Sequence, residues 1–179
     1  MASRDIWSHG VGSSLRDLLQ SCCSTLLLSR NESQPAYFSS PWMSNFVLYQ
    51  NPFREWSGLF PDLAGQTEIR FADYLTRLAS LRPVRLIIVD NSTTRSFLKT
   101  PALVESEKIQ FRFAPETYHE KGILTDEFYV EGSMNLTHSG VFLRDEKVVF
   151  HPQVGNESKI NLAYLQFNRL WETLGVEPC

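Results

Sequence analysis

The chain has 179 residues and a formal net charge of −3, and 42% of its residues are hydrophobic and 12% are aromatic. This length supports one domain, spanning residues 1–179, with its own hydrophobic core, and the composition excludes an intrinsically disordered protein. No apolar run approaches the ~20 residues of a membrane-spanning helix, and the small negative charge gives no general attraction to nucleic acid or to anionic membranes.

The amino-terminal region carries no apolar signal sequence, and the three cysteines form no disulfide framework, so we expect a cytoplasmic protein. A helix is predicted from the serines at 13–14 to about residue 24, with residues 25–28 beginning a strand. The loop at residues 9–13 is interpreted as a connecting turn rather than an anion-binding helix start. Cys22 and Cys23 are interpreted as packing residues of the helix rather than as nucleophiles.

Residues 31–66 contain four prolines, which break the segment, and many aromatic side chains. We expect these aromatic side chains to pack in the core or at an interface. Stacking on nucleic-acid bases is the less favoured alternative.

The rest of the chain alternates between helical and strand-like segments. The predicted elements are a helix at 69–81, a strand at 84–90, a helix at 94–103, a strand at 109–113, two short strands near 122–124 and 128–130, a strand at 148–150 and a closing helix at 160–174. This order predicts an α/β sandwich.

One stretch carries most of the functional information. Residues 119–135 read H-x-K-x4-D-x5-G-S-x-N, with the fixed positions His119, Lys121, Asp126, Gly132, Ser133 and Asn135. A chance match is expected at roughly one in 10^8 start positions, because each residue type has a frequency of a few per cent. If residues 119–121 are extended, His119 and Lys121 point the same way, and Gly132 lets the backbone approach a ligand closely.

Taken singly, these residues have ordinary explanations. A lone His-x-Lys on a strand is usually a solvated edge, and Asp126 alone would be a turn residue. Jointly they offer an imidazole, a fixed cation, a hydroxyl and an amide at one point. A phosphodiester needs such a set, with a nucleophile or acid and donors for its non-bridging oxygens.

The stretch resembles the HKD signature of the phospholipase D superfamily, whose members cleave phosphodiesters through a phosphohistidine. The likeness continues through Asn135-Leu136-Thr137 and Gly140 to Glu146 ahead of a strand, and it covers about residues 80–151. Before this range, residues 39–42 resemble the Ser-Pro-aromatic turn that often follows the first strand pair in such folds. It implies an α/β/α sandwich with a central mixed sheet. The chain departs from the family in two respects, because Glu131 stands beside Gly132 and the motif occurs once.

The resemblance also implies how the residues act. Two HKD motifs meet at a two-fold axis in this superfamily, so a single-motif chain is expected to form a homodimer. One His119 attacks phosphorus and the other protonates the leaving oxygen. Lys121, Ser133 and Asn135 hold the phosphoryl oxygens, Asp126 supports local structure, and Glu146 orients His119. No metal or other cofactor is required.

The resemblance leaves the substrate open. We expect a nuclease acting on DNA, and the finer likeness is to the phospholipase D-like component of bacterial 7-deazapurine DNA-modification or defence systems, which implies partner proteins of such a complex. One alternative is a phosphodiesterase for phospholipids or small molecules. The other is a non-catalytic nucleic-acid-binding subunit of a larger complex, against which the intact His119, Lys121 and Asn135 argue.

Overall fold

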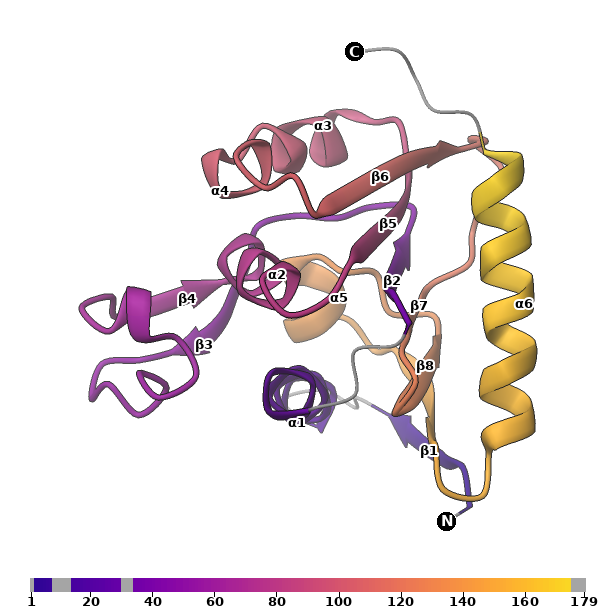
Figure 1. The fold of residues 1–179 in the computed structure, drawn as a ribbon, viewed down its shortest axis with the longest axis horizontal. Helices are drawn as coiled ribbons and strands as arrows, with labels where there is room; N and C mark the ends of the chain where they lie inside the picture. Colours follow the sequence, from indigo (N-terminus) through magenta and orange to yellow (C-terminus); the bar gives the residue numbers. More distant parts are fainter. Residues whose placement is uncertain (1, 8–13, 30–33, 175–179) are drawn as a thin grey trace.

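A seven-stranded mixed sheet forms the centre of the molecule (Figure 1). The computed structural model describes residues 2–7, 14–29 and 34–174. The strand order is β1-β9-β8-β7-β2-β5-β6, in which β2, β5 and β6 run parallel and the other neighbours are antiparallel. The strands span β1 Arg4–Trp7, β2 Ala36–Ser40, β5 Val84–Val89, β6 Ile109–Ala114, β7 Gly122–Leu124, β8 Phe128–Gly132 and β9 Lys147–Pro152.

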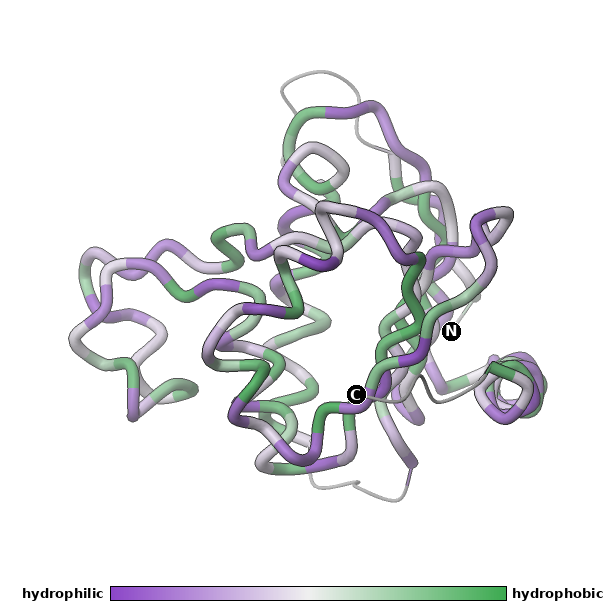
Figure 2. The backbone as a smooth tube through the Cα atoms, turned by 90° about the horizontal axis from the view of Figure 1, so that it is seen from above, coloured by the Kyte–Doolittle hydropathy of each residue, from purple (hydrophilic) through white to green (hydrophobic). Residues whose placement is uncertain are grey.

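Helices cover both faces of this sheet. The long helix α6, Glu157–Thr173, lies by itself on one face and is seen end-on in Figure 2. The opposite face carries α1 Ser14–Leu28, α2 Phe71–Ala79, α3 Ser92–Leu98, α4 Pro101–Val104 and α5 His138–Phe142. A small second sheet, made of β3 Val47–Gln50 and β4 Glu68–Arg70 with the short helix η1 Pro61–Leu63 between them, projects from this side (Figure 1).

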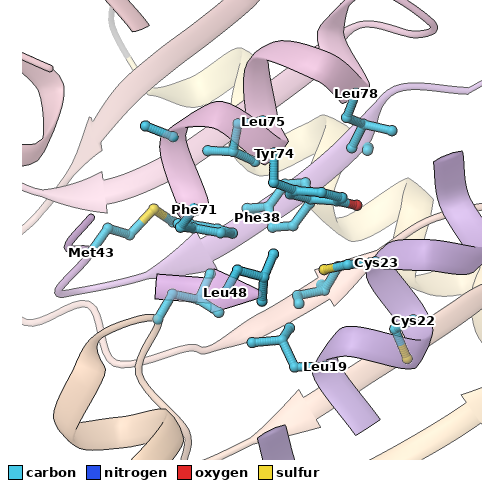
Figure 3. Packing of buried hydrophobic residues seen from close by; sticks show 14 of the residues in the cluster. Leu19, Cys22, Cys23, Phe38, Met43, Leu48, Phe71, Tyr74, Leu75 and Leu78 are labelled. Carbon is cyan, nitrogen blue, oxygen red and sulfur yellow. The ribbon is translucent and has the colours of Figure 1, made fainter. Parts of the chain in front are cut away.

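Each face of the sheet has its own hydrophobic core. On the side of α1 and α2, side chains of both helices close over Phe38 of β2 (Figure 3). On the side of α6, Tyr37 of β2 packs among Tyr164, Phe167 and Trp171. Successive strand residues point to opposite faces, so Tyr37 and Phe38 serve different cores.

The predicted fold class is confirmed, since helices flank a central mixed sheet on both faces. The strands at β5, β6, β7, β8 and β9 and the closing helix α6 lie where the sequence places them. No helix in the described ranges is long and apolar enough to cross a bilayer.

Three predictions at the ends of elements were wrong. The first helix continues to Leu28 instead of giving way to a strand, because the buried positions from Leu15 to Leu26 keep helical spacing throughout. The expected helix at 69–81 is preceded by β4 and begins at Phe71, where the backbone N–H of Arg70 donates to the Asp73 carboxylate at 2.9 Å.

The third of these predictions was a single helix at 94–103. The chain instead forms α3 and α4, because Pro101 takes the first position of a new helix and lacks the N–H that a continuous helix would need.

The interpretation of Cys22 and Cys23 as packing residues agrees with the structure, since both are buried in α1. Burial raises the pKa of the Cys22 thiol to about 12 and also raises the pKa of Cys23. Neither thiol is therefore ionised near neutral pH, which removes the thiolate that a nucleophilic cysteine needs.

Candidate active site

The residues of the motif other than Asp126 lie at one edge of the sheet. The carboxyl ends of β2 and β8 and the amino ends of β7 and β9 meet there, as the pairs Ser39–Gly122, Gly122–Glu131 and Gly132–Val148 demonstrate. The parallel strands β5 and β6 also end at this edge. Ligands of open α/β sheets commonly bind beyond such carboxyl ends.

His119 and Lys121 lie just outside the sheet rather than in a strand. The sequence placed both side chains on one face only if residues 119–121 are extended, and in the structure these residues precede β7, which begins at Gly122. The His119 side chain is exposed, and the Lys121 ammonium donates a 2.6 Å hydrogen bond to the backbone carbonyl of His119. This contact ties the cation to the residue that bears the imidazole, so the two remain neighbours without a common strand face.

Tyr118 anchors the segment that carries His119. Its hydroxyl lies 2.5 Å from Oγ of Ser39, and Ser39 Oγ also lies 3.4 Å from the backbone carbonyl of Glu120. Burial raises the pKa of Tyr118 to about 12, so its hydroxyl keeps its proton for this contact at neutral pH. Sequence reasoning missed this contact, because Ser39 and Tyr118 are 79 residues apart along the chain.

Gly132 and Ser133 lie directly against the backbone of β9. Gly132 has a φ of 155°, and a Cβ there would lie 2.2 Å from the carbonyl oxygen of Lys147. The glycine is therefore required by the neighbouring strand, and its role in letting the backbone approach a ligand stays a prediction. Ser133 Oγ accepts from the Lys147 N–H at 3.0 Å and lies 3.3 Å from its carbonyl oxygen.

Asn135 is held by a serine that the motif does not include. Ser40 Oγ lies 3.2 Å from Oδ1 of Asn135 and accepts from the N–H of Leu136 at 3.2 Å. With the amide oxygen turned to Ser40, the amide nitrogen of Asn135 is the group that can donate to a phosphoryl oxygen. The only signal for Ser40 in the sequence is the Ser-Pro-aromatic turn at 39–42.

A close contact explains the glycine that follows the motif. A Cβ at Gly140 would lie 2.3 Å from the backbone oxygen of Asn135. Thr137 caps α5 by accepting from the N–H of Gly140 at 3.1 Å. Gly140 therefore packs directly against the backbone of Asn135.

Asp126 is in the motif but not at this edge. It follows the far end of β7 and forms an ion pair with Arg82, with 2.8 Å between Nη1 and Oδ1. Only 1% of the Arg82 side chain and 11% of the Asp126 side chain are exposed. The structure therefore separates Asp126 from the other motif residues and gives it a local structural contact.

Glu146 lies next to the edge that holds Ser133. Its side chain is buried, and it immediately precedes Lys147, whose backbone bonds Ser133. Its role in orienting His119 stays a prediction.

Glu131, where the sequence departs from the family pattern, takes part in a separate polar network. Its Oε1 lies 2.6 Å from Nζ of Lys159 and 2.8 Å from Nε2 of His151. Burial acts to raise the pKa of this carboxyl, but hydrogen bonds from Lys159 and His151 outweigh it and leave the pKa below its usual range. The network joins β8 and β9 to α6, so Glu131 serves to attach the helix.

Within residues 2–7, 14–29 and 34–174, no group of three or more His, Cys, Asp or Glu side chains is arranged to hold a metal ion. The loop at 9–13, which was interpreted as a connecting turn, lies outside the described residues. The described site therefore offers an exposed imidazole, a lysine, a serine and an asparagine, a set suited to a phosphoryl group.

Known structures share this architecture. The fold is similar to that of NucT from Helicobacter pylori, with a TM-score of 0.60 and 13% identity over 98% of this chain and 100% of that chain. It is also similar to Nuc from Salmonella typhimurium, a phospholipase D family member, with a TM-score of 0.57 and 14% identity over 93% and 94% of the two chains. The chain has a phospholipase D-like fold.

The fold is also similar to part of TrmBL2, an archaeal chromatin protein with a novel mode of DNA binding. Here the TM-score is 0.53 and the identity 12%, over 96% of this chain and 53% of that chain. No protein-family model and no curated protein matches the sequence. At these sequence identities the similarity shows the fold alone and not an activity.

Proposed function

We propose that the protein is a metal-independent phosphodiesterase, a nuclease that cleaves DNA as a homodimer through a phosphohistidine. The observation that supports this most is the position of His119. His119 is exposed just before β7, and its backbone carbonyl accepts from the Lys121 ammonium, at the sheet edge that also holds Ser133 and Asn135. The site has a nucleophile, a cation and neutral donors for the phosphoryl oxygens.

The proposed reaction has two steps. One His119 nitrogen bonds to phosphorus while the phosphorus–oxygen bond to the leaving group breaks, and the second subunit's imidazolium gives its proton to the leaving oxygen. Water then attacks the phosphohistidine, gives a proton back to the second imidazole and releases the first. Lys121, Ser133 and Asn135 stabilise the charge on the phosphoryl oxygens in both transition states.

The homodimer follows from the single motif. One His119 cannot act as nucleophile and acid at the same moment, so we expect two subunits to share one site across a two-fold axis. Light scattering at micromolar concentration should give the mass of a dimer. A strict monomer with full activity would contradict the two-histidine reaction.

A DNA-binding role without catalysis is the second candidate, because the fold is similar to that of TrmBL2. The exposed His119 and the donors around it have no evident purpose in such a protein. We also propose that the protein is a component of a bacterial DNA-modification or defence system. It would then bind partner proteins of that complex.

An assay with excess EDTA tests the function. Purified protein is incubated with single-stranded DNA, duplex DNA, RNA and a phospholipid vesicle, each with the chelator present. We expect DNA to be cleaved at the same rate with EDTA as without it. Loss of activity in EDTA with recovery in magnesium would overturn the metal-independent reaction, and cleavage of lipid alone would favour the lipid alternative. If no diester is cleaved but DNA is bound, the binding role takes precedence.

A further inference from the structure

Two adjacent serines end the strand β2, which lies between β7 and β5 in the sheet. Ser39 and Ser40 are both 0% exposed. A buried hydroxyl adds little net stability, since an apolar side chain of similar shape avoids the cost of removing a polar group from water. The two serines are therefore explained better by the groups that they hold than by packing.

The two serines point to opposite faces of the sheet. Side chains alternate along a strand, so Ser39 shares the α6 side with Tyr37 and Ser40 points to the other side. Their contacts agree with this. Tyr118, which contacts Ser39, packs against the core beside α6, and Leu136, which contacts Ser40, belongs to the core beside α1 and α2.

Ser39 holds the residues on both sides of His119. Its Oγ lies 2.5 Å from the hydroxyl of Tyr118 and 3.4 Å from the backbone carbonyl oxygen of Glu120. When the Tyr118 hydroxyl donates to Ser39, the proton of Ser39 can point to the Glu120 carbonyl, so one arrangement satisfies both contacts. The segment that carries the imidazole is thus tied to β2 immediately before and immediately after His119.

Ser40 holds another part of the candidate site. Its Oγ lies 3.2 Å from Oδ1 of Asn135 and accepts a 3.2 Å hydrogen bond from the N–H of Leu136. It also lies 2.7 Å from the carbonyl oxygen of Trp42, so three contacts fix this hydroxyl. A bridge between Met43 and Leu136 continues the attachment just beyond β2. The amide that we expect to bind a phosphoryl oxygen is thus held by the same strand end as the imidazole segment.

This strand end fixes the two parts of the site relative to each other. Consecutive Cα atoms are about 3.8 Å apart, and β2 is hydrogen-bonded to β7 on one side and to β5 on the other. Ser39 and Ser40 therefore cannot move independently, as two separate loops could. A displacement of about 1 Å can slow a reaction by about 100-fold, so a common support matters for a nucleophile and a donor that act on one phosphate.

We propose that Ser39 and Ser40 are positioning residues, which place His119 and Asn135 for reaction at the same phosphate. This inference rests on the phosphodiesterase function proposed above and adds two residues from outside the motif to its site. Neither serine needs to touch the substrate, because Ser39 acts through residues 118–120 and Ser40 acts through the Asn135 amide.

Steady-state kinetics of the full chain on labelled DNA and on bis(p-nitrophenyl) phosphate test the proposal. Ser39→Ala and Ser40→Ala should each lower kcat by about 10- to 100-fold and leave KM close to the wild-type value, because they displace reacting groups without removing a substrate contact. Tyr118→Phe keeps the ring, and combined with Ser39→Ala it should be no slower than the slower single variant, because both changes break one contact. In Asn135→Ala protein, Ser40→Ala should likewise add little.

The matched control is Thr125→Val, which removes a buried hydroxyl away from the site. Thr125 is also 0% exposed, and its Oγ1 accepts from the N–H of Phe128 at 3.1 Å, beyond the far end of β7. This variant should lower the melting temperature about as much as the serine variants do and should leave kcat unchanged. Thermal unfolding of every variant therefore separates lost stability from lost positioning.

NMR of isotope-labelled protein gives a readout that does not depend on turnover. Ser39→Ala should increase the motion of the His119 backbone N–H. Ser40→Ala should increase the motion of the Asn135 backbone N–H, and Thr125→Val should affect neither group.

Three results would overturn the proposal: unchanged kcat in both serine variants, an equal loss of kcat in Thr125→Val, or unchanged motion at both His119 and Asn135. A double variant with Tyr118→Phe that is much slower than either single variant would also contradict the role given to Ser39. If wild-type protein cleaves no diester while the changes in motion appear, the phosphodiesterase function fails and the attachment of the two segments to β2 stands.

Discussion

Replacing His119 with alanine is expected to lower the rate of phosphodiester hydrolysis by roughly 10^3-fold or more while leaving the fold intact. The loss is large because the imidazole serves as nucleophile in one subunit and as acid in the other. The fold should tolerate the change because the side chain is exposed, so its removal leaves no cavity. Initial rates on a labelled diester, with thermal unfolding of the same samples, measure both effects.

The matched control is His138→Ala. His138 is also exposed and stacks on Phe142 with ring centroids 5.0 Å apart, at the start of a helix outside the motif. It should retain near-normal activity. His151 is a poor control, because it is 3% exposed and hydrogen-bonded to Glu131. Mixed dimers with one wild-type His119 should also be badly impaired, and near-normal activity of His119→Ala would show that the motif is assigned the wrong role.

Replacing Arg82 with methionine should give the largest loss of stability, about 3–5 kcal/mol. The change leaves the Asp126 carboxylate without its cation at a position where only 11% of the side chain is exposed. A buried charge that loses its partner keeps the cost of desolvation. Chemical denaturation gives the free energy of unfolding for both proteins.

Arg95→Met provides the comparison, because it breaks an ion pair of the same chemistry on the surface. Arg95 and Asp90 are 63% and 37% exposed, so the expected loss is about 1 kcal/mol or less. Arg82→Met combined with Asp126→Asn should recover part of the stability, since no unpaired charge remains. Equal losses in Arg82→Met and Arg95→Met would contradict a structural role for this pair.

Much of the fold follows from local patterns in the sequence. The apolar run of β5 and the alternation in β6 are properties of consecutive residues, and both strands were predicted close to their observed bounds. The order of helices and strands gave the α/β class for the same reason. The HKD motif was readable because its residues are close in sequence as well as in space.

What could not be predicted depends on pairing between distant segments. The strand β1 was not predicted, because it forms only by pairing with the distant strand β9. Arg4 pairs with Phe150 and Trp7 pairs with Lys147, which are 146 and 140 positions apart along the chain. The contact between Arg82 and Asp126 spans 44 positions and leaves no local trace. The anchors Ser39 and Ser40 acquire their roles only when β2 is placed beside β7.

A covalent adduct on His119 is the most direct measure of the proposed chemistry. Protein turning over a diester is quenched in alkali, which preserves phosphohistidine, and its peptides are mapped by mass. We predict a phosphoryl or nucleotidyl group on the peptide that contains His119, and none in His119→Ala protein. An adduct on any other residue of the active protein would contradict the phosphohistidine reaction at this site.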